Sequence, residues 1–146
     1  MKLITYCILT LILYSVGYSQ DCTDFHQYQC TYADYTFYYS RQSKSLLYQK
    51  GQTSELQIVV YEGEDYYISV CSARKIGKIR FRILNDDNER QVLFDNADSE
   101  YATSVTFSNE STSNLIIEIS TPDATSRDSK TVGCVGVVVQ FRKTSG

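Results

Sequence analysis

The residue types that perform most catalysis are scarce in this chain of 146 residues. His26 is the only histidine, there is no tryptophan, and neither a G-x-S-x-G nor an H-E-x-x-H motif occurs. The sequence therefore lacks the residues that a serine triad or a zinc hydrolase requires. A histidine base would have to be His26, which we expect in an exposed cystine loop. Paired carboxylates could hydrolyse glycosides, but the acidic residues cluster in turns, where solvation explains them. We predict that the protein is not an enzyme.

Two acidic turns supply the hard oxygen ligands that calcium prefers. The first turn contains Asp86, Asp87, Asn88 and Glu89, and the second contains Asp95, Asn96 and Asp98. Their spacing does not fit the twelve-residue helix-loop-helix pattern, which needs a glycine at its sixth position. One interpretation is a calcium site, and the other is two hydrophilic β-turns without any cofactor.

Tyrosines are more numerous than a purely structural account requires. Five of them follow Cys22 closely, namely Tyr28, Tyr32, Tyr35, Tyr38 and Tyr39. Aromatic rings of this kind bind sugars and protein partners, although tyrosine is also an ordinary strand former. In the alternating run that contains Tyr35, Phe37 and Tyr39, we expect this side to face the core and Tyr38 to face away. Tyr35, Tyr38 and Tyr39 are our aromatic candidates for a binding surface.

A basic stripe is the second candidate for binding. Lys78, Arg80 and Arg82 alternate with apolar residues, so they fall on one face of a strand. Such a stripe could bind an anionic polymer, for example an acidic glycan. The alternative is that these residues are solvated and pair across strands with Glu118 or Glu55.

The cysteine content indicates an oxidising compartment. Apart from Cys7, the chain holds Cys22, Cys30, Cys71 and Cys134, an even number that suggests two disulfides. Of the three possible pairings, the close spacing of the first two cysteines favours Cys22 with Cys30, and Cys71 with Cys134. A zinc site is the competing interpretation, but there is no C-x-x-C pair and only one histidine.

The start of the sequence has the form of a signal peptide. Lys2 is followed by an apolar run from Leu3 to Val16 and by small residues at Gly17 and Ser19, so we predict a signal peptide over residues 1–19 and a single domain over 20–146. The apolar run is too short to span a bilayer, and we expect no membrane insertion. The predicted location is periplasmic or secreted. The formal charge of −3 argues against a nucleic-acid partner.

Alternation of apolar and polar residues with period two predicts an all-β fold. We expect strands at 35–40, 46–49, 56–60, 66–70, 78–84, 91–95, 102–107, 114–120 and 134–143, a polar loop at 123–131, and a helical turn only at 23–28. The strands at 56–60 and 66–70 look like a hairpin that turns at 62–65. About eight or nine short strands predict a two-sheet antiparallel β-sandwich of jelly-roll type, or a barrel.

Four segments, Tyr39–Ser43, Val59–Cys71, Leu93–Asn96 and Gly133–Val137, resemble a family of uncharacterised exported proteins from Bacteroidota. The likeness covers most of the chain after the signal peptide and implies a Cys71–Cys134 bond, but it implies no mechanism. The order of elements is also similar to bacterial prepeptidase C-terminal domains, which are jelly-roll sandwiches of which some bind calcium or glycans.

The leading hypothesis from these observations is a non-enzymatic, exported binding module of the cell envelope, with a glycan or a protein as its ligand. A purely structural or stress-related envelope protein is the alternative, and a small secreted hydrolase is third. The sequence leaves the oligomeric state open.

Overall fold

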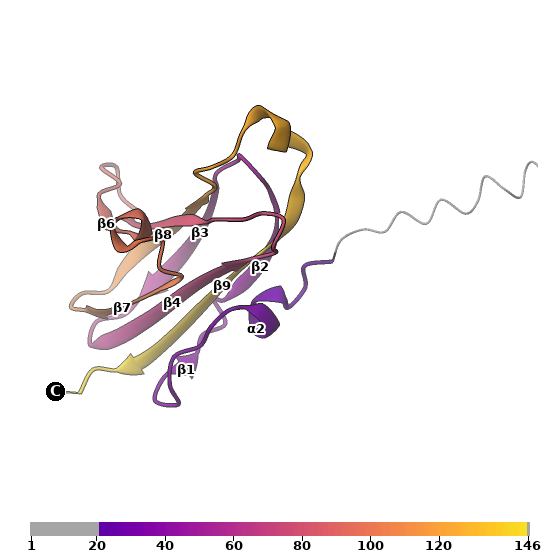
Figure 1. Cartoon of the computed structure of the whole chain (residues 1–146). Helices are drawn as coiled ribbons and strands as arrows, with labels where there is room; N and C mark the ends of the chain where they lie inside the picture. The colour runs from indigo at the N-terminus through magenta and orange to yellow at the C-terminus, as the bar shows by residue number, and fades with distance from the viewer. Residues whose placement is uncertain (1–20, 146) are drawn as a thin grey trace, which may run out of the picture.

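The alternating segments form nine strands in the computed structural model, which describes residues 21–145 (Figure 1). The strands are β1 (Tyr38–Tyr39), β2 (Lys44–Gln49), β3 (Ser54–Val60), β4 (Glu64–Ser72), β5 (Arg80–Asn85), β6 (Val92–Asp95), β7 (Ser104–Asn109), β8 (Ser113–Ser120) and β9 (Val132–Lys143). The larger sheet has the order β1-β9-β4-β7, with β2 also paired to β9, and the smaller has the order β3-β8-β5-β6. All pairs are antiparallel, so the predicted all-β, two-sheet sandwich is confirmed.

Three short helical segments complete the described chain. They are α2 (Phe25–Gln29), η2 (Asn96–Ser99) and η3 (Ser126–Lys130), and none of them is long or apolar enough to cross a bilayer. The α2 helix lies where a helical turn was predicted, whereas η3 occupies the predicted polar loop. The predicted signal peptide and its cleavage site lie outside the described residues.

The core lies between the sheets and contains the residues that the alternation predicts. Phe81 and Ile83 on β5 are almost fully buried, whereas Arg80 and Arg82 point outward and are partly exposed. The same regularity places the alternate apolar residues of β3, β4, β8 and β9 in one cluster, including Ile58, Val60, Tyr66, Ile68, Ile117, Ile119, Val135 and Val137.

The predicted hairpin of residues 56–70 is wrong. β3 pairs with β8 in the smaller sheet, whereas β4 pairs with β9 and β7 in the larger one. The turn between them, with Gly63 at φ +77°, therefore carries the chain from one sheet to the other. Period-two alternation shows which face of a strand is buried, but it does not show which strand is its neighbour.

The two central strands of the larger sheet, β4 and β9, are buried on both faces because residues 21–37, here called the N-terminal layer, cross their outer side (Figure 1). Polar side chains under this layer are satisfied by it. The Ala33 N–H donates to Gln140 Oε1 at 2.8 Å, and the Ser69 hydroxyl donates to the Thr31 carbonyl at 2.6 Å. The sandwich therefore has a third, thin layer on one side.

Two disulfides fasten the N-terminal layer to the sheet beneath it. Cys22 is bonded to Cys134 on β9, and Cys30 is bonded to Cys71 on β4. The predicted Cys22–Cys30 and Cys71–Cys134 pairing is therefore wrong, including the bond that the family resemblance implied. Cys22 and Cys30 flank α2, which lies flat on the sheet, so each cysteine meets a partner below it and not its neighbour in sequence.

A glycine on β9 allows this close approach. A Cβ atom on Gly136 would lie 2.7 Å from His26 Cα and 2.9 Å from Cys30 Sγ. No other residue type fits at this position without a backbone shift, because real Cβ contacts are not that short. The sequence thus reserves space on the sheet for the layer that covers it.

Candidate binding site

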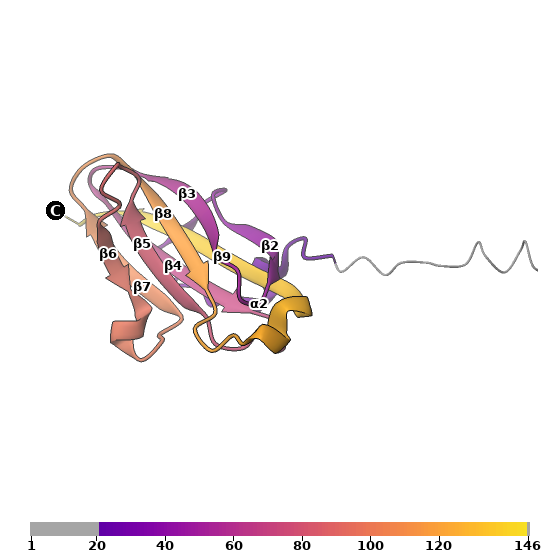
Figure 2. The ribbon, with the colours of Figure 1, turned by 90° about the horizontal axis from the view of Figure 1, so that it is seen from above.

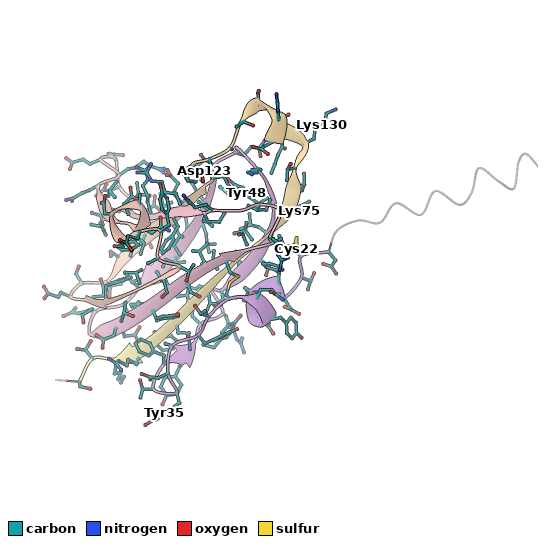
Figure 3. All side chains as sticks on the ribbon, in the orientation of Figure 1. Cys22, Tyr35, Tyr48, Lys75, Asp123 and Lys130 are labelled. Atoms are coloured by element: carbon teal, nitrogen blue, oxygen red, sulfur yellow. A yellow bond between two sulfur atoms is a disulfide. The ribbon has the colours of Figure 1, made fainter. Side chains whose placement is uncertain are left out.

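The candidate binding residues of the sequence do not form one surface. Tyr38 and Tyr39 form β1 at the edge of the larger sheet, whereas Arg80 and Arg82 lie on β5 in the smaller sheet. Tyr35 projects from the N-terminal layer away from both sheets (Figure 3). Each group therefore has to be judged separately.

The basic stripe is neutralised by carboxylates of neighbouring strands. Arg80 Nε donates to Asp95 Oδ1 at 3.1 Å, and Arg82 Nε donates to Glu118 Oε1 at 2.9 Å. The Arg80 guanidinium holds the pKa of Asp95 below its usual value. Cross-strand pairing with Glu118 is thus confirmed for Arg82, and these two arginines are already committed to partners within the chain.

The two acidic turns lie at opposite ends of β6, so they cannot share a cation. Asp86, Asp87 and Asn88 precede the strand and are exposed, whereas Asp95 is its last residue and Asp98 follows it. Asp87 Oδ1 accepts from the backbone N–H groups of the two residues at the end of its own turn, at 3.1 and 2.8 Å. Within residues 21–145, no group of three or more His, Cys, Asp or Glu side chains is placed to hold a metal ion.

His26 is buried, contrary to the predicted exposed position. Its Nδ1 lies 2.6 Å from Ser45 Oγ and its Nε2 lies 2.7 Å from Tyr39 Oη. Burial lowers the pKa of His26, against the opposing charge of Asp24. Because both ring nitrogens have partners inside the protein, the histidine joins the N-terminal layer to β2 and β1, and its geometry does not suit a general base.

The tyrosines of the N-terminal layer and Tyr39 on β1 are exposed to solvent, so the predicted core side at Tyr35 and Tyr39 is wrong. Tyr35 is 97% exposed, Tyr28 79% and Tyr39 43%. Only Tyr38 and Tyr39 pair with β9, so the run is too short to present one continuous inner face. Phe37 packs instead under the Arg142 guanidinium, 4.5 Å from its ring centroid.

Tyr38 lines a concave region at the end of the sandwich where β4 begins and β9 ends. This end lies near the C-terminus, away from the end that carries η3 (Figure 2). This region consists of two adjoining cavities of about 510 and 140 Å³ that share Glu64 and Phe141. We call it the aromatic hollow and define it by Tyr38, Tyr61, Glu64, Tyr66, Phe141 and Lys143.

The rings of the hollow are held by one another. Tyr38 is 68% exposed, and its ring centroid lies 6.2 Å from that of Phe141 at an interplanar angle of 44°. Phe141 in turn lies 6.5 Å from the buried ring of Tyr66. The hollow therefore has an exposed aromatic wall that stands on a fixed aromatic floor.

The polar groups of the hollow leave one carboxylate oxygen and one ammonium group available. The Tyr66 hydroxyl donates to Glu64 Oε2 at 2.5 Å and accepts from the Tyr61 N–H at 2.9 Å, and burial raises the pKa of Tyr66. Within the described chain, Glu64 Oε1 accepts no hydrogen bond and Lys143 forms no ion pair. A ligand with hydroxyl groups and an apolar face would find partners for both here.

Sequence reasoning identified Tyr38 but missed Glu64, Tyr61 and Phe141. Glu64 lies in the predicted turn at 62–65, and Phe141 lies in the last predicted strand, at 134–143, where nothing in the alternation distinguishes it. They meet Tyr38 because β4 and β1 both pair with β9, where Phe141 is opposite Tyr66 and Tyr38. The richness in tyrosine was the one signal that pointed to this end of the molecule.

The sequence matches no protein-family model and no curated protein. Among solved structures, the fold is similar to PliG of Aeromonas hydrophila, a periplasmic inhibitor of g-type lysozyme, with a TM-score of 0.47 and 7% sequence identity. The match covers 77% of this chain and 90% of that chain. A similarity at this level carries no conclusion about what the present protein does.

Proposed function

We propose that this protein is an exported, non-enzymatic binding module of the cell envelope and that its aromatic hollow binds a glycan. The observation that carries the proposal is the 68% exposed Tyr38 ring, braced by Phe141 next to the free oxygen of Glu64. A sugar ring offers an apolar C–H face to an aromatic side chain while its hydroxyl groups donate to a carboxylate.

The rigid surroundings of the hollow favour binding. Tyr66 is fixed by its hydrogen bonds to Glu64 and to the Tyr61 backbone, and Phe141 is part of the β9 ladder. Because the floor of the hollow is already fixed, a ligand that stacks on Tyr38 does not have to order Tyr66 or Phe141, which lowers the entropic cost of binding.

Export is supported by the two disulfides, since such bonds form and persist in oxidising compartments. A periplasmic or secreted location and an origin in the exported Bacteroidota family both belong to this proposal. The absence of a placed histidine base favours binding over hydrolysis, because both nitrogens of His26 are engaged inside the protein.

A protein ligand is the second candidate, on a different surface. Tyr28 and Tyr35 are 79% and 97% exposed on the N-terminal layer, which is covalently fixed to the sheet. Exposed tyrosines on a rigid support are typical of protein–protein interfaces.

Titration calorimetry on ligands selected from an array of neutral and acidic glycans tests the proposal. We expect Tyr38→Ala to weaken glycan binding by about tenfold or more, a loss of about 1.4 kcal/mol, because it removes the stacking wall. Tyr35→Ala is the matched control, since it removes an even more exposed tyrosine ring that lies outside the hollow, and it should leave the affinity unchanged. Equal losses in the two variants, or no glycan binding by the wild-type protein, would overturn the assignment of the site.

A further inference from the structure

A second cavity lies on the side of the sandwich where the sheets are not connected, and it is separate from the aromatic hollow. β6 and β7 are the last strands of their sheets there, and they do not pair with each other. Between them lies a cavity of about 180 Å³, here called the edge pocket, lined by Ile83, Leu93, Phe94, Val105, Phe107 and Leu115. All six side chains are apolar, and none of them lines the hollow.

On the opposite side of the sandwich, one side chain connects the two sheets, unlike on the side of β6 and β7. Gln42 Oε1 accepts from the Val59 N–H at 2.7 Å, and Gln42 Nε2 donates to the Val59 carbonyl at 3.0 Å. Gln42 follows β1 of the larger sheet and Val59 belongs to β3 of the smaller one, so the amide bridges the two sheets. No such bridge is present between β6 and β7 in the described chain.

The walls of the edge pocket are preformed. Phe94 packs on the fully buried ring of Phe81 with centroids 5.4 Å apart, and Phe107 stacks on the buried Tyr66 at 5.8 Å. Closing the pocket by rotation of either phenylalanine would break one of these contacts. The cavity is therefore a stable feature of the packing.

The spacing of the two strands is fixed by Asn96, in the connection that follows β6. Asn96 is 1% exposed, and its side-chain Oδ1 accepts a hydrogen bond from the Phe81 N–H at 2.9 Å. Nδ2 donates to the carbonyls of Ile79 and Ala102, each at 3.1 Å. Because Ala102 lies just before β7, this one amide holds the end of β6 and the approach to β7 against β5.

Size and polarity define what fits into the edge pocket. An apolar cavity of roughly 150 Å³ stays dry and holds one benzene molecule, because its walls offer water no hydrogen bonds. The edge pocket is slightly larger, and one of its lining residues, Leu93, is 51% exposed and forms an apolar rim. A ligand can therefore bury an apolar tail, rest against an apolar rim and keep a polar head group in water.

We propose that the edge pocket binds the tail of a single-chain amphiphile. Linear carboxylates of increasing length are the probe, titrated below their micelle concentration into the protein while the methyl NMR signals of Ile83, Val105 and Leu115 are recorded. The shifts should saturate, and the affinity should rise about fourfold for each methylene from butanoate to octanoate, until the tail fills the pocket.

Two variants locate the binding. Val105→Phe fills the pocket and should abolish the saturable shifts of the other two methyl groups. Leu93→Ser changes an exposed rim residue that the fold does not need, and it should weaken octanoate binding severalfold even if Val105→Phe fails to fold. Leu47→Ser, at a 56% exposed leucine on β2, is the matched control and should leave binding unchanged.

The outcomes that overturn the proposal are equally definite. Wild-type methyl signals that do not saturate, an affinity independent of chain length, or equal weakening by Leu93→Ser and Leu47→Ser would each show that the edge pocket takes no alkyl tail. None of these results bears on glycan binding at the aromatic hollow, which lies elsewhere.

Discussion

The outer faces of the two sheets are built in opposite ways. On the larger sheet, Ser69 and Gln140 are buried because the N-terminal layer covers them and hydrogen-bonds to them. On the smaller sheet, Arg80 and Arg82 meet solvent and are paired with carboxylates of neighbouring strands. On the exposed face, ion pairs between neighbouring strands satisfy the charged side chains. On the covered face, disulfides hold the N-terminal layer, which has little hydrophobic core of its own.

The two sheets also differ in the polar groups that they leave free for the proposed ligand. The exposed tyrosines lie on and beside the layer that covers the larger sheet, and the aromatic hollow, in which Glu64 and Lys143 keep unused polar groups, lies at the end of the same sheet. The exposed side has its charges committed to one another. A basic stripe that is evident in the sequence is therefore a poorer guide to the proposed binding surface than aromatic rings that only the fold brings together.

The largest effect should come from removal of the disulfides that hold the covered side. The Cys22–Cys134 bond closes a loop of 112 residues and the Cys30–Cys71 bond one of 41. In the chain-entropy model, these loops correspond to about 5 and about 4 kcal/mol of stability, respectively. Urea unfolding of Cys22→Ser/Cys134→Ser and of Cys30→Ser/Cys71→Ser should show losses of this order.

A crossed pair of substitutions is the control for the connectivity. In protein from which the predicted signal peptide, and with it Cys7, has been removed, Cys71→Ser/Cys134→Ser takes one cysteine from each bond and should leave two titratable thiols, whereas Cys22→Ser/Cys134→Ser should leave none. The reverse result in thiol titration would restore the pairing expected from the sequence.

These cysteines show what the sequence could predict and what it could not. The compartment and the number of bonds follow from an even count, but the pairing depends on α2 lying flat across β4 and β9, which no spacing rule contains. In the same way, alternation identified Phe81 and Ile83 as core, because facing is a local property. It could not show that β3 and β4 belong to different sheets, because strand partners are chosen over long range.

The candidate site was predictable only in part, for the same reason. Tyr38 stood out by residue type, whereas Glu64 and Phe141 acquire their role from the β4–β9 and β1–β9 registers. The burial of His26 was missed because it results from the layer above it, and a single histidine between two cysteines gives no local sign of burial.

A smaller effect, confined to the covered side, should appear with pH. The pKa of His26 is lowered in the folded protein because burial disfavours the charged form, so the unfolded chain binds the proton more readily. This contribution to stability is complete above the unfolded value of about 6.5 and is lost as the pH falls below it.

Hydrogen exchange of α2 tests this pH dependence. Protection of the α2 amides should decrease from pH 7.5 to pH 5.5 in the wild type, and the pH dependence should be absent in His26→Gln. The pKa of Asp95 is lowered by Arg80, so protonation of Asp95 should weaken the Arg80–Asp95 ion pair, and the protection of β5, only near pH 4 and below. If the amides of β5 lost protection at a higher pH than those of α2, the pH dependence could not be assigned to His26.

The smallest effect should come from the exposed side. Arg82→Gln removes a partly exposed ion pair with Glu118, and we expect a loss of at most about 1 kcal/mol in urea unfolding. Glycan affinity should not change, because Arg82 is remote from the aromatic hollow. A tenfold loss of affinity in Arg82→Gln would move the binding surface to the smaller sheet.

The most direct way to test whether the aromatic hollow binds a glycan is to map which residues the bound ligand contacts. Backbone and side-chain NMR signals are followed while a glycan selected from the array is titrated into the wild-type protein. If the aromatic hollow binds the glycan, the largest shifts will occur at Tyr38, Glu64 and Phe141, with little change at Arg80 and Arg82. Shifts centred on β5, or confined to Tyr28 and Tyr35 of the N-terminal layer, would show that the aromatic hollow is not the glycan site.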